Sequence, residues 1–320
     1  MKKVITLLAS LLALTITGCN NQPSSANKQS NDNQSISNES RHQHTYSRLM
    51  IREDANKRTY LVGEDFDDDG LFVSALCTSC KSVDLVPYTL SNDTNLEVGQ
   101  TSVTIGYEDL TLDYEIKVVE KYHIACVGDS LTKGHRWENE SYPTKLSGIV
   151  DEHYEVGNFG INGISITGYG GNSIKYLTDG VYQKSIAFNP DIIAIMLGTN
   201  DATGWANAEA TFVEDYHILL DSYIEQFPLA KFIMMVSPPV VTPNQFDIPN
   251  DTIRDEVNPV QRELAEEYGF ELLDLREEFE ATENYQSRFL RPNNDNVHFT
   301  VEGAEYVANR VWDIVQELNF

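Results

Sequence analysis

Five continuous apolar runs constrain the fold of this 320-residue chain more than any other feature of its sequence. Each has the length of one strand, and together they occupy residues 122–128, 154–160, 191–198, 231–238 and 270–275. Stretches with apolar residues at helical spacing lie between them, most plainly residues 209–227, and another follows at residues 301–318. Uninterrupted apolar strands that alternate with helices are typical of a parallel sheet covered on both faces. We therefore predict an α/β domain over residues 121–320, with its functional groups at the carboxyl ends of the strands.

The preceding segment, residues 48–120, follows a different pattern. Short alternating runs such as LFVSALC and TSVTIGY are separated by clusters of Gly, Asn and Asp, which predicts a small antiparallel β-sandwich. The phrases YLVGEDFDDDGLFVSA and LEVGQTSVTIGYEDLTLDYEIKV resemble the bacterial immunoglobulin-like domains of surface proteins. We expect such a domain here, with its protein partner left open.

The N-terminal residues have the pattern of an export signal. Two lysines precede an apolar run that is too short to span a bilayer and that ends in small residues. The sequence ITGC, which ends at Cys19, resembles the lipobox of bacterial lipoproteins and implies that Cys19 becomes lipidated. Residues 19–47 contain few apolar side chains and are predicted to form a disordered tether. We expect residues 1–18 to be removed, leaving an exported lipoprotein that is anchored to the membrane at the cell surface.

The charge balance limits the partners of the folded part. The chain has 23 Lys and Arg against 49 Asp and Glu, which gives a net charge of −26 at pH 7. A surface this acidic repels nucleic acids and anionic headgroups. We therefore expect no nucleic-acid partner, and we expect the membrane contact to come from the lipid anchor.

Three cysteines remain besides Cys19. Cys77 and Cys80 form a C-x-x-C pair, which is half of a zinc site, and the sequence contains no second pair. In an exported chain a local disulfide between them is favoured, with two free thiols as the alternative. Cys126 lies in an apolar run, and we expect it to be buried and inert.

No metal or cofactor site is predicted. His42 and His44 lie in the tether, where two histidines of a flexible segment bind a metal only weakly. The sequence D-x-D-x-D-G that begins at Asp65 matches the first half of a calcium loop. Its twelfth position holds Leu76 instead of Glu, and the flanking pattern indicates strands, which argues against calcium.

The first strand of the α/β domain ends in GDSLTKG, residues 128–134, a turn whose role is ambiguous by itself. A phosphate-binding loop needs Lys and then Ser or Thr after its last glycine, but here Lys133 precedes the glycine. The G-x-S-x-G elbow of α/β-hydrolases also fails, because Thr132 stands where its second glycine belongs. What remains is Ser130, exposed in a tight strand-to-helix turn.

Three more polar motifs follow later in the chain. The second strand ends in NFGING (residues 158–163), the third ends in GTND (residues 198–201), and DNVH (residues 295–298) precedes the last helix. With GDSL, these motifs resemble the four blocks of the SGNH hydrolases, the GDSL family of esterases and lipases. The resemblance covers residues 122–320. It implies a flavodoxin-like, three-layer fold and a serine esterase that works without a cofactor.

The resemblance also implies a catalytic triad. Ser130 would be the nucleophile and His298 its general base, and Asp295 would hold the imidazole in the right tautomer. Elementary chemistry agrees, because a serine hydroxyl needs an adjacent base that a third group orients. His135 also lies close to a motif, and we leave it as either a substrate contact or a surface residue.

For the oxyanion hole, the family pattern assigns the backbone N–H of Ser130, the backbone N–H of Gly163 and the side-chain amide of Asn200. A glycine suits such a position because no Cβ keeps the substrate away from its N–H. Asn162 departs from the pattern, since many relatives carry Ser there, but the glycine is retained. Asp129 and Asp201 are interpreted as loop-fixing hydrogen-bond acceptors.

The expected substrate is a small-molecule or glycan ester. The sequence MLGTNDATGW resembles the branch of the family that deacetylates carbohydrates, and Trp137, Tyr169 and Trp205 are candidates for stacking on sugars. Residues 238–251 are expected to wall the site without a long apolar stripe, which favours short acyl groups. A lipase or lysophospholipase with the same triad remains an alternative, and so does a non-catalytic adhesin.

Overall fold

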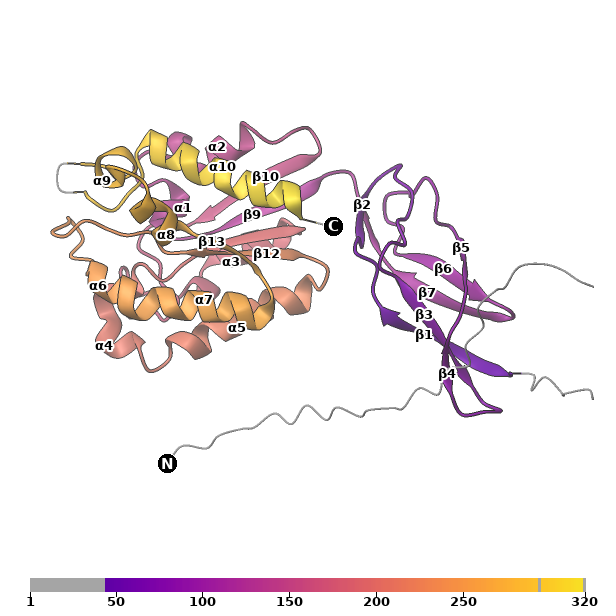
Figure 1. Ribbon diagram of the computed structural model, residues 1–320. Coiled ribbons are helices and arrows are strands. Elements are labelled where there is room, and N and C mark those ends of the chain that lie inside the picture. The colour runs from indigo at the N-terminus through magenta and orange to yellow at the C-terminus, as the bar shows by residue number, and fades with distance from the viewer. Residues whose placement is uncertain (1–43, 293–294, 319–320) are drawn as a thin grey trace, which may run out of the picture. The chain divides into compact units, whose positions relative to one another are not determined.

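The computed structural model describes residues 44–292 and 295–318 (Figure 1). The predicted signal peptide, Cys19 and His42 lie outside the described residues. The tether was predicted to end at residue 47, but the first strand already begins at Tyr46. Within the described part of the chain, no helix is long and apolar enough to cross a membrane.

The first folded region is built from short strands: β1 (Tyr46–Glu53), β2 (Thr59–Leu61), β3 (Phe72–Cys77), β4 (Val83–Leu85), β5 (Thr89–Ser91), β6 (Ser102–Tyr107), β7 (Leu110–Glu115) and β8 (Lys117–Val119). Strands β1, β3 and β4 form one antiparallel sheet, and β5, β6 and β7 form another. Val73 of β3 and Ile105 of β6 belong to the same buried cluster, so the two sheets share one core. This is the predicted β-sandwich.

One pair of strands departs from the antiparallel prediction. Strand β2 pairs with β8 in parallel, with Tyr60 opposite Val118. A parallel pair cannot be joined by a tight hairpin, and here the intervening strands of the domain make the connection. Because the two strands are more than 50 residues apart in the sequence, the local alternation of apolar residues does not predict this pairing.

The second region contains a parallel sheet with the strand order β10–β9–β11–β12–β13. The bounds are β9 (Tyr122–Gly128), β10 (Tyr154–Gly160), β11 (Ile192–Met196), β12 (Lys231–Val236) and β13 (Glu271–Asp274). Counted from β9, this is the 2-1-3-4-5 order of flavodoxin-like folds, which confirms the predicted fold class. Every residue of β11 is buried, as the continuous apolar run predicted for a strand covered on both faces.

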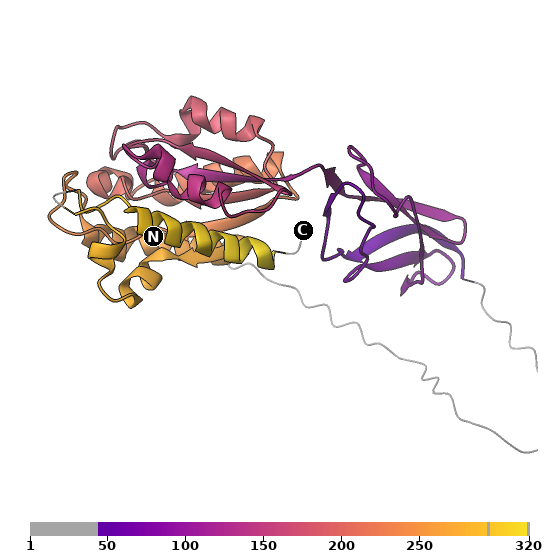
Figure 2. The same ribbon diagram turned by 90° about the horizontal axis from the view of Figure 1, so that it is seen from above.

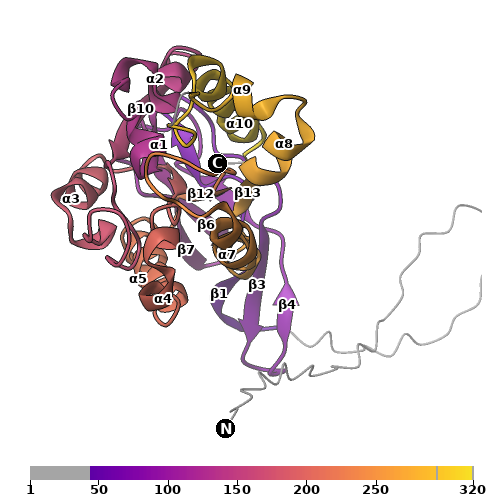
Figure 3. The same cartoon turned by 90° about the vertical axis from the view of Figure 1, so that its left-hand side faces the viewer.

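The helices cover both faces of this sheet. Figure 1 shows α2 and α10 on one side and α5 and α7 on the other, and the end-on view of Figure 3 agrees. The view from above shows α10 running along its face of the sheet (Figure 2). The α-helices are α1 (Ser130–Lys133), α2 (Tyr142–Ser147), α3 (Gly180–Ala187), α4 (Trp205–Ala208), α5 (Phe212–Gln226), α6 (Asn250–Thr252), α7 (Asn258–Tyr268), α8 (Leu275–Ala281), α9 (Tyr285–Arg288) and α10 (Val301–Glu317). The 3-10 helices are η1 (Glu138–Glu140), η2 (Tyr176–Thr178) and η3 (Asp201–Gly204), and η4 (Ile253–Val257) is a π-helix.

The structure agrees with the predicted state of the three described cysteines. Cys77 and Cys80 are bonded to each other, with their Cα atoms 5.7 Å apart. Cys126 is free and buried in β9, and this burial raises the pKa of its thiol to about 12. At neutral pH the Cys126 thiol is therefore protonated and unreactive.

Candidate active site

The turn between β9 and α1 presents Ser130 at the carboxyl edge of the sheet. Ser130 is the first residue of α1, and Asp129 caps the helix because its Oδ1 accepts the N–H of Leu131 at 2.8 Å. Gly128 allows the chain to turn this tightly, since a Cβ there would lie 2.0 Å from the hydroxyl oxygen of Thr132. The Asp129 cap and the tight packing of Gly128 against Thr132 together fix the backbone position of Ser130.

Three side chains from distant parts of the chain form a hydrogen-bonded row. The Ser130 hydroxyl lies 2.8 Å from Nε2 of His298, and Nδ1 of His298 lies 2.9 Å from Oδ1 of Asp295. The same carboxylate oxygen accepts the backbone N–H groups of Val297 and His298 at 3.2 and 2.9 Å. These contacts orient the imidazole, with one ring nitrogen toward the acid and the other toward the serine.

The hydrogen bonds to Asp295 keep its carboxyl group ionised. Partial burial alone would raise the pKa of Asp295, but the hydrogen bonds from the ring and backbone of His298 outweigh it and lower the pKa to about 2. The carboxylate is therefore negative throughout the neutral range. It can stabilise the positive charge that His298 acquires when it takes a proton.

Two aromatic side chains hold the imidazole of His298 from different directions. His135 stacks on it, with the ring centroids 4.4 Å apart and the planes 19° from parallel. Phe246 meets it edge-on at 5.0 Å and 86°. Burial, followed by the charge of His298, lowers the pKa of His135, which favours a neutral ring beside the candidate base. The sequence left His135 as either a substrate contact or a surface residue; in the structure it stacks on His298 and lines the cavity beside Ser130.

A cavity of about 400 Å³ opens beside the Ser130 hydroxyl. Gly163 forms part of the cavity wall. Its φ is 72°, a backbone conformation that favours glycine. Phe246 and Ile248 come from the segment 238–251, which walls the cavity as expected. The lining residues are Ser130, His135, Asn162, Gly163, Gly171, Asn172, Asn200, Thr203, Phe246, Ile248 and His298.

Asn200 directs its amide nitrogen toward the same turn. Its Nδ2 donates to the carbonyl of Ile164 at 2.8 Å, and the second N–H has only a long contact of 3.4 Å to Oδ2 of Asp129. This second hydrogen is therefore weakly engaged. The structure brings Ser130, Gly163 and Asn200 to one cavity, as the motif order required.

Two buried acids support the loops behind the cavity. Asp201 accepts hydrogen bonds from the N–H of Ile166 at 3.0 Å and from the hydroxyl of Thr167 at 2.7 Å. Burial raises the pKa of Asp201 against the effect of these bonds. At Asp129, burial and the nearby Asp201 outweigh the hydrogen bond from Leu131 and raise the pKa to about 7. Both acids fix loops, as interpreted from the sequence.

The three aromatic residues proposed to stack on sugars do not line this cavity. Trp205 packs against Phe212 of α5, with the ring centroids 5.2 Å apart, and so belongs to the packing of the domain. Tyr169 is 53% exposed and Trp137 is 47% exposed. One face of Trp137 is covered by the guanidinium of Arg291, 3.9 Å from the ring centroid.

Several lining residues carried no signal in the sequence. Thr203 follows the GTND motif by two residues and Asn172 follows the NFGING motif by nine, but nothing in their spacing marks them. Phe246 and Ile248 were covered only by the expectation that their loop walls the site. Position after the carboxyl end of a strand is the only signal that could have found them.

Comparison with known proteins matches two families along the chain. Residues 126–306 match the GDSL-like lipase/acylhydrolase family, and residues 54–118 match the bacterial immunoglobulin-like domain, group 3. The first match covers the row of side chains and the cavity, and the second covers most of the sandwich.

Individual relatives are more distant. An acetylxylan esterase of Xylanibacter ruminicola is 27% identical over 173 residues, which are 48% of this chain and 35% of that enzyme. An acetylxylan esterase of Geobacillus stearothermophilus is 27% identical over 215 residues, which are 60% of this chain and 93% of that enzyme. The crystal structure of a lipase/acylhydrolase from Enterococcus faecalis is 22% identical, covers 61% of this chain and 96% of that chain, and has a TM-score of 0.48.

The family match extends over more than half of the chain and contains the three motifs that follow strand ends and the DNVH motif before the last helix. The protein therefore belongs to the GDSL-like lipase/acylhydrolase family, with a bacterial immunoglobulin-like domain ahead of its hydrolase domain.

Proposed function

We propose that this protein is a serine esterase that removes short acyl groups, chiefly O-acetyl groups, from carbohydrates. The observation that carries the proposal is the row Ser130–His298–Asp295, with contacts of 2.8 and 2.9 Å, beside a cavity of about 400 Å³. The acetylxylan esterases among the relatives support the choice of acyl group and substrate class.

In the proposed reaction, the Ser130 oxygen attacks the ester carbonyl while Nε2 of His298 takes the hydroxyl proton. Asp295 accepts a hydrogen bond from Nδ1–H of His298, which leaves Nε2 unprotonated and able to take the serine proton. Its carboxylate then stabilises the imidazolium that forms. The tetrahedral intermediate collapses as His298 gives the proton to the leaving sugar alkoxide. Water, activated by the same imidazole, then releases the acid from the acyl-enzyme.

The negative charge that develops on the carbonyl oxygen needs donors aimed at it. The candidates are the backbone N–H groups of Ser130 and Gly163 and the weakly engaged amide hydrogen of Asn200. One such donor is worth about 3 kcal/mol of transition-state stabilisation in comparable sites. The N–H of Ser130 belongs to the first turn of α1, so it has no partner within the helix.

The cavity favours a short acyl group over a fatty chain. Phe246 and Ile248 are the two large apolar side chains in its lining, and most of the other lining residues are polar or glycine. Each buried CH₂ of an acyl chain gains about 0.8 kcal/mol only where apolar atoms surround it. A lipase for long chains would need a longer apolar wall than these two side chains provide.

Hydrolysis of p-nitrophenyl esters from acetate to laurate, together with a panel of acetylated glycans, tests the proposal. We expect kcat/KM to be highest for acetate, and Ser130→Ala to lower it by at least about 10⁴-fold. Ser147→Ala, an exposed serine on α2, is the matched control and should retain full activity. Retained activity in Ser130→Ala would overturn the mechanism, and a preference for laurate would favour the lipase alternative.

We further propose that the enzyme acts outside the cytoplasm as a lipoprotein. The charged start, the short apolar run and the ITGC sequence at Cys19 support this. Labelled palmitate should enter the wild-type protein in bacterial cells and should not enter Cys19→Ser. Equal labelling of both proteins would exclude Cys19 as the lipidated residue.

A further inference from the structure

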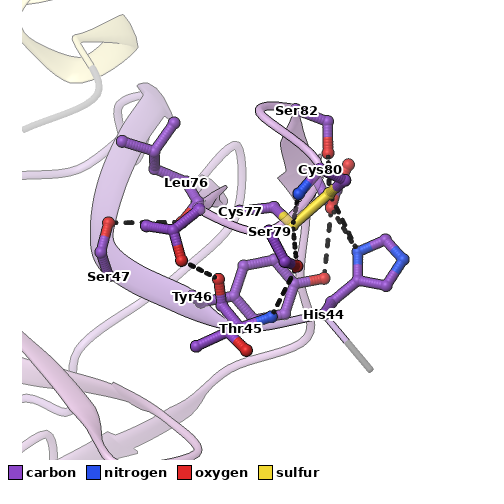
Figure 4. The surroundings of a disulfide bond; sticks show 11 residues. His44, Thr45, Tyr46, Ser47, Leu76, Cys77, Ser79, Cys80 and Ser82 are labelled. Atoms are coloured by element: carbon purple, nitrogen blue, oxygen red, sulfur yellow. Dashed lines mark hydrogen bonds and ion pairs between the residues drawn. A yellow bond between two sulfur atoms is a disulfide. The ribbon is translucent and has the colours of Figure 1, made fainter. Parts of the chain in front are cut away.

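A cluster of metal-binding side chains lies at one end of the immunoglobulin-like domain. It consists of His44, just before β1, Cys77 at the end of β3, Cys80 in the following turn and Asp84 in β4. Within residues 44–292 and 295–318, this is the one group of three or more His, Cys, Asp or Glu side chains whose donor atoms converge in this way. Figure 4 shows His44 turned toward the two sulfur atoms.

In the structure the two sulfurs are bonded to each other, and we propose that the reduced form of this cluster binds one zinc ion. The ligands would be the thiolates of Cys77 and Cys80, Nδ1 of His44 and a carboxylate oxygen of Asp84. The disulfide and the zinc ion would then be alternative cross-links between the same two cysteines, one in the oxidised and one in the reduced chain. The proposal does not depend on the esterase activity.

The geometry needs little rearrangement. The four donor atoms lie within 4.8 Å of one another. In a tetrahedral zinc site, bond lengths of about 2.0–2.3 Å put ligand atoms about 3.3–3.8 Å apart. His44 Nδ1 already lies 3.6 Å from Cys80 Sγ and 3.1 Å from an oxygen of Asp84. The main change is the separation of the two sulfurs once their bond is broken.

The surroundings suit thiolate and carboxylate ligands. The backbone N–H of Cys80 points at Sγ of Cys77 at 3.2 Å, and the hydroxyl of Ser82 lies 3.0 Å from Sγ of Cys80. The phenol of Tyr46 donates to Asp84 at 3.2 Å. Such outer contacts orient the ligands and stabilise their charge.

The donor set favours zinc over calcium or magnesium. Two soft thiolates and an imidazole prefer zinc, whereas calcium and magnesium prefer oxygen ligands. The side chains of His44 and Asp84 are 46% and 30% exposed, so an ion can enter from solvent. Two thiolates and one carboxylate supply three negative charges, which more than balance the ion.

The two states are connected by a balanced redox step. A dithiol reductant gives two electrons and two protons to the Cys77–Cys80 bond and leaves as its own disulfide. Zinc then replaces the two thiol protons. An oxidant reverses the step by re-forming the disulfide, and the ion is released.

Cobalt(II), a spectroscopic substitute for zinc, tests the proposal on the full chain. The chain carries Cys19→Ser so that this thiol does not compete, and one sample is reduced with a phosphine under nitrogen. We expect the reduced chain to bind one cobalt ion with thiolate charge-transfer and tetrahedral ligand-field bands, and zinc to displace it. The oxidised chain should show neither band.

Variants of the non-sulfur ligands decide whether the whole cluster takes part. His44→Ala and Asp84→Asn should each weaken zinc binding by at least about tenfold. The matched controls are His153→Ala and Asp109→Asn, two exposed residues elsewhere in the chain, and they should bind zinc like the parent. Circular dichroism confirms that each variant is folded, and hydrolysis of p-nitrophenyl acetate should be the same in all of them.

Three results would overturn the zinc site: a reduced chain that binds no cobalt, unchanged affinity in both His44→Ala and Asp84→Asn, or a disulfide that resists excess phosphine in the folded chain. None of these results bears on the esterase, whose own test uses Ser130→Ala.

Discussion

Asp129, in the turn that carries Ser130, makes the stability of the domain depend on pH. Its carboxyl group is fully buried between the cap of α1 and the amide of Asn200. Burial raises its pKa from 3.8 to about 7, so the folded chain binds this proton more tightly than the unfolded chain does. The free energy of unfolding must therefore fall as the pH rises from about 4 to about 7, by up to about 4 kcal/mol from this group.

Asp129→Asn should remove that dependence, because the amide keeps the cap acceptor but never ionises. The variant's stability relative to wild type should increase steadily between pH 4 and pH 7 and then level off. Urea denaturation at several pH values measures the difference. Asp109→Asn, at an exposed residue, is the control and should show a flat difference, and an equally flat curve for Asp129→Asn would contradict the assignment.

The stack of His135 on His298 predicts a graded effect of ring replacement. Aromatic contacts of this kind are worth about 0.5–1.5 kcal/mol, so His135→Ala should lower kcat by a few-fold to about tenfold. His135→Phe keeps a flat ring at the 4.4 Å position and should stay within about twofold of wild type. Steady-state kinetics on p-nitrophenyl acetate separate kcat from KM, and equal losses in both variants would refute the stacking role.

At the scale of elements, the turn from β9 into α1 tolerates no added atom. A Cβ on Gly128 would lie 2.0 Å from the Thr132 hydroxyl and 2.7 Å from the carbonyl oxygen of Met196. Gly128→Ala must therefore shift the helix that carries Ser130. We expect a loss of about 1–3 kcal/mol of stability and a loss of activity larger than the unfolded fraction explains.

Gly180, in the first turn of α3, provides the matched control. A Cβ there meets nothing within 4 Å, so Gly180→Ala should be neutral or should stabilise the chain by up to about 1 kcal/mol. Thermal denaturation together with kcat of both variants makes the comparison. Similar effects of the two substitutions would show that the turn is not sterically limited.

Elements with continuous apolar runs were predictable almost to the residue. Strands β9 and β10 occupy the predicted residues, and α10 ends one residue before its predicted limit. The start of β1 was missed because residues 44–47 resemble the tether in composition, although Tyr46 pairs with Cys77 of β3. The parallel β2–β8 pair was missed because long-range pairing leaves no periodic trace.

At the scale of the whole molecule, the sequence predicted the residues around the Ser130 hydroxyl but not the loop residues that complete the cavity wall. Ser130, Gly163 and Asn200 were found because each stands in a motif that follows a strand, and His298 was found in the motif before the last helix. Phe246 and Ile248 were not singled out, since loops reach a site through tertiary folding alone. The cluster at Asp84 was missed for the same reason: the cysteine pair and His44 were judged separately, and only the fold brings them together.

The charge of the entire chain should affect which glycans it processes. A net charge of −26 repels acidic substrates over about 30 Å at 0.01 M salt but only about 8 Å at 0.15 M. KM for an acetylated oligosaccharide that carries uronic acid should therefore fall as salt is added, while KM for a neutral acetylated oligosaccharide stays constant. An anionic substrate whose KM ignores salt, or rises with it, would rule out this effect.

The candidate nucleophile Ser130 and its candidate base His298 are 168 positions apart, and strands β10 to β13 lie between them in the sequence. During synthesis the serine therefore emerges long before the histidine that would act as its base. A partly synthesised chain can therefore carry Ser130 without the histidine that would activate it. Under the proposed mechanism, ester hydrolysis can begin only after His298 has been synthesised and has folded against the turn that carries Ser130, so turnover would report that this last contact of the site has formed.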